Sequence, residues 1–146
     1  MENISEQKNK LILWTILVLS IAGFIDATYL AMKKLIGSPV TCYAFNNGCG
    51  VVDASSYSSI FGIPLSVFGF LFYAVAILLL VRFFLRKEQR VLKAAIAVLI
   101  FGGVFSLYLI ALQMFVIKAY CLYCIISDTI GIMNALLVLY ILKNEK

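Results

Sequence analysis

The sequence predicts an all-α integral membrane protein, built as a bundle of four transmembrane helices. Of its 146 residues, 64% are hydrophobic and 13% are charged, whereas an ordinary soluble domain is about 25% charged and about 45–50% apolar. A soluble chain of this length could not enclose so much apolar surface in one core. The second observation is a set of four long apolar runs, because a transmembrane helix needs about 20 predominantly apolar residues.

The four runs predict helices over about residues 11–33, 64–85, 92–117 and 120–142. Acidic residues interrupt only the first and last of them, at Asp26 and Asp128. Basic residues precede the first run, as they do in a secretory signal peptide. That run is longer than the apolar core of such a peptide, however, and no small-residue cleavage site closes it. We therefore expect a retained helix and a single transmembrane domain over residues 1–146.

The lysines and arginines predict the orientation of the bundle. With four spans, nine of the 12 basic residues share a side with both termini and three lie on the other side, namely Lys33, Lys34 and Lys118. The positive-inside rule then places both termini in the cytoplasm. We expect a multi-pass protein of the plasma membrane. The charges lie between apolar runs and form no basic polar face, so the expected surroundings are membrane lipid and not nucleic acid.

This orientation places all four cysteines on the extracytoplasmic side. Cys42 and Cys49 lie between the first and second helices, and Cys121 and Cys124 lie at the outer end of the fourth. Disulfides persist in such an oxidising compartment.

Two interpretations of the pair in the first connection stay open. Six residues separate Cys42 from Cys49, and the sequence Asn46-Asn47-Gly48 is typical of a turn that brings the two sulfurs together. The pair could be a structural disulfide, although closing so short a loop stabilises a fold only modestly. It could instead be redox-active.

The second pair forms a CxxC motif at a helix start. If the fourth helix begins near Tyr120, Cys121 and Cys124 lie one turn apart on one face. Unpaired N–H groups and the helix dipole lower the pKa of thiols there, an arrangement typical of thiol–disulfide exchange. Four cysteines could also bind zinc. The loop spacing is too wide for a usual zinc site and the chain has no histidine, so no metal is expected.

Two cysteine pairs on one side suggest a relay through mixed disulfides. The chain has no histidine for haem, no nucleotide-binding motif and no iron–sulfur spacing, so a lipid-soluble quinone is the expected electron acceptor. Asp128 lies four residues after Cys124, on the same helical face. Intramembrane carboxyls are costly and often functional. We consider Asp128 either a proton relay for quinone reduction or a hydrogen-bonded structural residue.

An ordered set of motifs carries a family resemblance. After Cys42 and Cys49 come Ser55, Tyr57, FGIP at 61–64, FGFLFY at 68–73 and CLYC at 121–124. In this order they resemble the vitamin K epoxide reductase (VKOR) family, specifically its bacterial or archaeal members, over about residues 11–142. DsbB-type quinone reductases also combine four helices with two cysteine pairs. Their CxxC lies in the first outer loop, however, whereas here it lies at the last helix.

The resemblance implies a bundle in which the extracytoplasmic connection between the first two helices caps a quinone pocket. Cys121 and Cys124 would be the active-site pair, with Cys124 against the quinone, and Cys42 and Cys49 the shuttle pair. The residues expected at the quinone are Ser55, Leu65 and Phe68. The quinone would be of the menaquinone, ubiquinone or vitamin K type.

The resemblance also implies a partner, a thioredoxin-like (DsbA-like) protein in which disulfides are made. Many bacterial members carry such a domain fused to the bundle; this chain stops at Lys146, so we expect a stand-alone member with a soluble or anchored partner in trans. Mammalian members have tyrosine where Asp128 stands and asparagine where Leu65 stands. Both departures argue against reduction of vitamin K epoxide, which is the alternative activity, with small or protein thiols as donors. A non-catalytic membrane protein with two structural disulfides is the alternative of another class.

Overall fold

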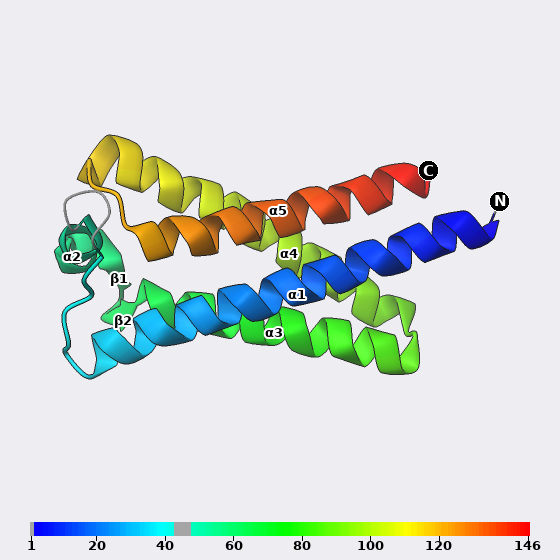
Figure 1. The fold of residues 1–146 in the computed structure, drawn as a ribbon, viewed down its shortest axis with the longest axis horizontal. Coiled ribbons are helices and arrows are strands. Elements are labelled where there is room, and N and C mark those ends of the chain that lie inside the picture. Colours follow the sequence, from blue (N-terminus) through cyan, green and yellow to red (C-terminus); the bar gives the residue numbers. More distant parts are fainter. Residues whose placement is uncertain (1, 43–47) are drawn as a thin grey trace.

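Four long helices lie side by side in the computed structural model, which describes residues 2–42 and 48–146 (Figure 1). They are α1 (Glu2–Leu35), α3 (Leu65–Arg86), α4 (Gln89–Ala111) and α5 (Leu122–Asn144). A π-helical turn, η3 (Leu112–Ile117), continues α4. Among the described residues, four helical stretches are long and apolar enough to cross a membrane. The predicted all-α membrane bundle is confirmed.

The helix ends differ from the predicted ones by a few residues, except at the first helix. That helix starts at Glu2 and not near residue 11, and the last starts at Leu122 and not near residue 120. Hydropathy marks the length that lipid surrounds, whereas helical hydrogen bonding continues into polar flanks or stops at a local cap. The apolar runs therefore locate the helices better than they locate the helix ends.

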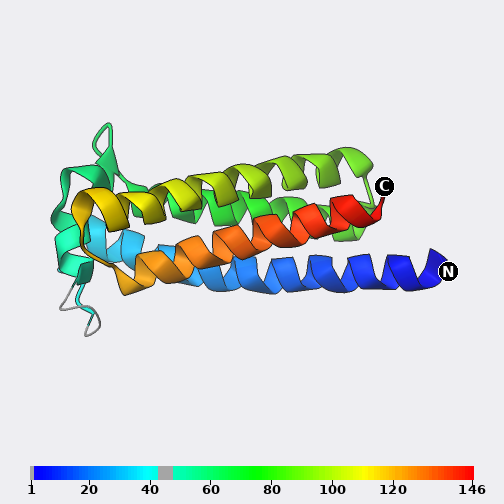
Figure 2. The same cartoon turned by 90° about the horizontal axis from the view of Figure 1, so that it is seen from above.

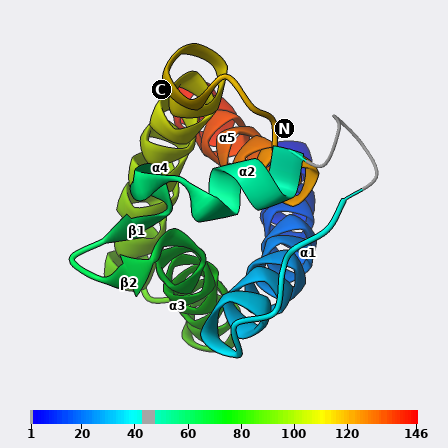
Figure 3. The same ribbon diagram turned by 90° about the vertical axis from the view of Figure 1, so that its left-hand side faces the viewer.

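The four helices form a closed ring. Helix α1 contacts α3 and α5, and α4 contacts the same two neighbours from the opposite side (Figure 3). Buried apolar side chains fill the ring toward the end that carries the termini, among them Ile16, Leu80, Leu99 and Val138. Large apolar side chains such as Leu78 and Leu85 are exposed on the outer faces, as expected where lipid is the solvent.

The connection between α1 and α3 lies across the end of the bundle opposite both termini (Figure 1). It contains α2 (Gly48–Ala54), a 3₁₀ turn η2 (Ser56–Ser58) and a hairpin of β1 (Ser59–Ile60) with β2 (Ile63–Pro64). Figure 2 shows the hairpin projecting beyond the bundle. The predicted turn residues Asn46 and Asn47 lie outside the described residues.

Helix α2 is held onto the bundle by α1. The Lys34 ammonium group donates to the Asp53 carbonyl oxygen at 2.7 Å and lies 3.2 Å from the Asp53 carboxylate. This double contact joins the last turn of α1 to α2. The segment that carries Cys49 is thus attached on its α1 side.

Candidate active site

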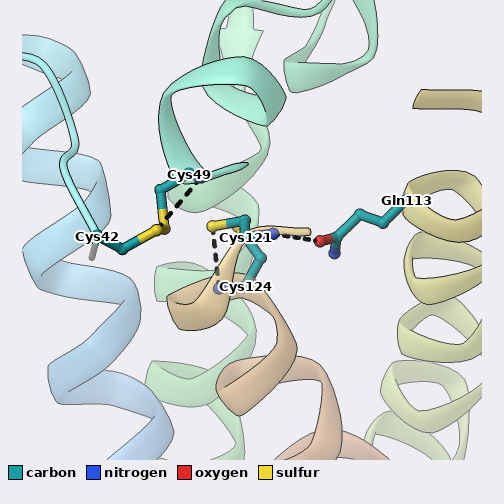
Figure 4. The surroundings of a disulfide bond; sticks show 5 residues. All are labelled: Cys42, Cys49, Gln113, Cys121 and Cys124. Carbon is teal, nitrogen blue, oxygen red and sulfur yellow. Dashed lines mark hydrogen bonds between the residues drawn. A yellow bond between two sulfur atoms is a disulfide. The ribbon is translucent and has the colours of Figure 1, made fainter. Parts of the chain in front are cut away.

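All four cysteines meet where α2 packs against the start of α5. Cys42 and Cys49 form a disulfide, and Cys121 and Cys124 are free thiols. The sulfur of Cys121 is directed toward the Cys42–Cys49 bond (Figure 4). Cys42, Cys49 and Cys121 are all at least 95% buried in one apolar cluster, and Cys124 packs against it. The structure therefore brings the two predicted pairs together.

A glycine permits this close approach. A Cβ atom at Gly48 would overlap the carbonyl oxygen of Tyr120, so only glycine lets the two backbones meet here. Gly48 directly precedes Cys49, and Tyr120 directly precedes Cys121. The backbone contact consequently holds these two cysteines next to each other.

The sequence predicts Cys121 within the first turn of the last helix. In the structure Cys121 instead precedes α5 and caps it. Its sulfur accepts a hydrogen bond from the Cys124 backbone N–H at 3.3 Å. Its own N–H donates to the Gln113 side-chain oxygen at 3.0 Å (Figure 4). At the N-cap the sulfur faces the N–H groups that have no partner within the helix.

These contacts stabilise the Cys121 thiolate. The hydrogen bond from the Cys124 side chain is the largest influence and lowers the pKa of Cys121, and the backbone N–H groups of Cys124 and Tyr123 lower it further. Burial and the Asp26 charge act in the opposite direction. The net effect is a pKa below the ordinary thiol value, so the thiolate fraction at neutral pH is increased.

We therefore expect alkylation of Cys121 by iodoacetamide to reach half of its maximal rate at a pH below the ordinary thiol range. Burial lowers the absolute rate but does not move this midpoint. The rates are measured by mass spectrometry of the Cys121 peptide in protein that keeps its Cys42–Cys49 disulfide. Cys124→Ala removes the main hydrogen bond and should move the midpoint to higher pH. Identical midpoints in the two proteins would contradict the assignment.

A cavity of about 680 Å³ lies next to the cysteines and is lined by residues of all four long helices and of the α1–α3 connection. This volume is within the usual range for small-molecule sites, about 300–1,000 Å³. Most of its wall is apolar, and Cys49, Cys121 and Cys124 form part of the wall. The polar side chains that line it include Tyr73, Ser106, Gln113, Ser127 and Asp128.

Not all of the residues that the sequence predicts at a quinone line this cavity. Leu65 and Phe68 line the cavity, as do Cys124 and Asp128. Ser55 lies outside it, against a shallow surface hollow beside α2. The Ser55 hydroxyl donates to the Val52 carbonyl oxygen at 2.7 Å and so caps the end of α2. Its contact with a quinone therefore stays a prediction.

The arrangement offers sulfur chemistry. In the described part of the chain, no three His, Cys, Asp or Glu side chains are grouped so that they could hold a metal ion. Two of the four cysteine sulfurs are bonded to each other. What the geometry provides is a disulfide, a nearby thiol pair with an activated member, and an apolar cavity beside that pair.

Comparison with known proteins agrees with this chemistry. The model of the vitamin K epoxide reductase family matches residues 14–140. The chain belongs to the VKOR family. A relative from Arabidopsis thaliana, thiol-disulfide oxidoreductase LTO1, is 41% identical over 51 residues. The matched stretch covers 35% of this VKOR-family chain and 14% of LTO1.

Three residues of this VKOR-family site were not identified from the sequence. Gln113, 4% exposed, holds the Cys121 backbone from the π-helical turn η3. Such turns are frequent at functional sites. Tyr73 and Ser106 reach the cavity from α3 and α4. A glutamine within a charge-free apolar run was the available signal, because polar residues inside membranes are seldom without a role.

Proposed function

We propose that this VKOR-family protein is a quinone-dependent thiol–disulfide oxidoreductase that makes disulfides in an extracytoplasmic thioredoxin-like protein. The observation that carries the proposal is the burial of the Cys42–Cys49 disulfide and the Cys121 and Cys124 thiols in one cluster, directly beside an apolar cavity. Neither a metal site nor a structural staple accounts for an activated thiol placed against a disulfide.

The electrons move inward in three exchanges. A reduced partner gives two electrons and two protons to the Cys42–Cys49 disulfide, and the partner becomes oxidised. The resulting thiols reduce a Cys121–Cys124 disulfide through a mixed disulfide. The inner dithiol then forms its disulfide again and passes two electrons and two protons to the quinone, which leaves as quinol. The structure corresponds to the stage at which the outer pair is oxidised and the inner pair reduced.

Cys49 is the better placed loop cysteine for exchange with Cys121. Both line the cavity, whereas Cys42 is not among its lining residues. The contact of Gly48 with Tyr120 brings the adjoining backbones together. Cys42 is then left to bond to the partner protein during exchange.

The cavity suits a quinone because its wall is mainly apolar and its few polar groups can hydrogen-bond ring carbonyls. Menaquinone, ubiquinone and vitamin K share a planar ring with two carbonyl oxygens. The chemistry of the cavity therefore supports a quinone as the electron acceptor and does not select among these three. The connection that contains α2 and the start of α5 lie at the end of the bundle opposite both termini (Figure 1), and the four cysteines belong to these two segments. With nine of the 12 basic residues at or near the terminal end, we place the cysteine end outside the plasma membrane.

A single-turnover experiment tests the proposal. Purified protein with reduced Cys121 and Cys124 is freed of reductant and mixed with decylubiquinone or menadione, and quinol absorbance and free thiols are followed together. We expect one quinol per chain as two thiols disappear. Replacing Cys49, which leaves Cys42 without its resolving partner, should also trap a mixed disulfide between Cys42 and a thioredoxin-like protein. The absence of both results would exclude the function, as would potentials below about −300 mV for both pairs, a range typical of structural disulfides.

A further inference from the structure

We propose that Asp128 carries a proton from the cysteine pair to the quinone oxygen, and that Tyr73 positions the turn of α5 on which Asp128 lies. This inference rests on the proposed quinone reduction. It assigns a role to a side chain that takes no part in the sulfur exchanges.

The first observation is the position of Asp128. It lies one helical turn after Cys124 on α5, and both residues line the cavity. A quinone in the cavity would therefore lie beside the sulfur that supplies electrons and beside the carboxyl group. No other acidic side chain among the described cavity residues shares the helical face of Cys124.

The second observation is an unpaired oxygen. Asp128 is 6% exposed, and its Oδ2 atom is buried without a hydrogen-bond partner among the described residues. The Ser106 side chain of α4 lies near the same carboxyl group. A purely structural carboxyl group normally has both oxygens satisfied when it is buried. Here one oxygen remains available to a ligand in the cavity.

The surroundings of Asp128 contain acids and no cation among its described electrostatic partners. Its electrostatic partners are Tyr73 of α3, Asp26 of α1, Cys124 of α5 and Cys121, which caps α5. A buried carboxylate without a cation is costly, whereas a neutral carboxyl group can be buried and can donate its proton. Asp128 is thus suited to pass a proton on and not to form an ion pair.

The transfer balances without any additional reactant. The Asp128 carboxyl group gives its proton to one quinone oxygen and takes up a proton from a thiol of the inner pair. The other thiol proton reaches the second oxygen. Two S–H bonds break and one S–S bond forms, while two electrons reduce the quinone and two O–H bonds form. Asp128 ends in its starting state.

Tyr73 fixes the turn that carries Asp128. Its hydroxyl donates to the carbonyl oxygen of Ser127 at 2.5 Å, and Ser127 directly precedes Asp128. Glycine makes room for the Tyr73 ring on α1 and for the Ser106 hydroxyl on α5. A Cβ atom at Gly23 would overlap the Tyr73 ring, and one at Gly131 would lie 3.7 Å from its hydroxyl and 2.5 Å from the Ser106 hydroxyl.

The test is the single-turnover reaction of Asp128→Asn, which keeps the size of the side chain but cannot exchange a proton. We expect quinol formation at saturating decylubiquinone to slow by about 100-fold, the lower end of typical general acid–base contributions. KM should stay within about twofold, because ground-state binding is retained. Reduction of the Cys121–Cys124 disulfide by dithiothreitol should be unchanged. Asp128→Glu restores the carboxyl group and should recover part of the rate.

Two further variants separate this role from a structural one. Glu88→Gln is the control, because Glu88 is an exposed acidic residue that does not line the cavity; its rate should equal that of the unmodified protein. Tyr73→Phe should slow the reaction, and adding it to Asp128→Asn should cause no further loss, as coupled residues require.

The possible outcomes are distinct. A rate for Asp128→Asn within about twofold of the unmodified protein would overturn the proton-transfer role and leave quinone reduction intact. Equal losses in quinol formation and in reduction by dithiothreitol would show a structural role and would also overturn it. No quinol from the unmodified protein would overturn both this inference and the proposed function.

Discussion

Replacing Cys124 with serine should abolish quinol formation by the reduced protein. Serine keeps a hydroxyl group that can still hydrogen-bond the Cys121 sulfur, but it provides no second sulfur with which Cys121 can form a disulfide. Without that bond the site cannot release two electrons. The measurement is the single-turnover quinol assay with decylubiquinone, with free thiols counted before and after mixing.

The matched variant is Cys121→Ser, which should also form no quinol but should differ in its disulfides. In Cys124→Ser, Cys121 remains beside the Cys42–Cys49 bond and can form a mixed disulfide with Cys49. In Cys121→Ser, the remaining thiol of Cys124 lies at the edge of the cluster and should form much less mixed disulfide with Cys49. Peptide mapping without reductant measures this difference. One full equivalent of quinol from either variant would contradict the assigned roles.

Gly48→Ala should uncouple the two cysteine pairs while the inner pair still reduces quinone. The added methyl group would overlap the Tyr120 carbonyl oxygen, and this oxygen belongs to a backbone that cannot rotate away as a side chain can. Helix α2 must therefore shift and carry Cys49 away from Cys121. Because a misplacement of about 1 Å can cost a reaction about 100-fold, we expect electron transfer between the pairs to slow by about that factor.

Rapid mixing tests this expectation. The outer pair is reduced selectively while the inner pair is kept as a disulfide. Samples are quenched with acid and alkylated at successive times, and the decrease in outer-pair thiols measures electron transfer to the inner pair. Val51→Ala is the control, since Val51 is on the exposed side of the same helix and is 53% exposed. If Gly48→Ala exchanged electrons as fast as Val51→Ala, the backbone contact would not be what places the cysteines.

The coarse architecture was predictable because it depends on composition summed over long stretches. Twenty or more apolar residues in a row specify a membrane-spanning helix whatever their neighbours are. The resulting four spans placed all four cysteines at one end of the bundle, and in the structure all four lie in or against one buried cluster. The helix ends were less predictable. Leu122 starts α5 because Cys121 caps it, and a cysteine cap has no distinct sequence signal.

The residues of the cavity wall were only partly predictable, for a similar reason. Leu65, Phe68 and Asp128 line the cavity, but Ser55 turns its hydroxyl to the end of α2, and Gln113 enters from a π-helical turn. Local hydrogen bonds decide such side-chain directions, and no pattern of hydropathy or spacing encodes them. A motif can therefore name a residue near the site without stating what that residue contacts.

The sequence by itself determined the class of protein, the four spans, and the pairing of one CxxC motif with a second cysteine pair on the same side. Those properties follow from residue types and their order. The tertiary structure alone decided that Cys49 lies against Cys121 and that Tyr73 of α3 holds the turn of Asp128. Both contacts join segments far apart in the chain, and both require glycines where two elements pack too closely for any larger side chain.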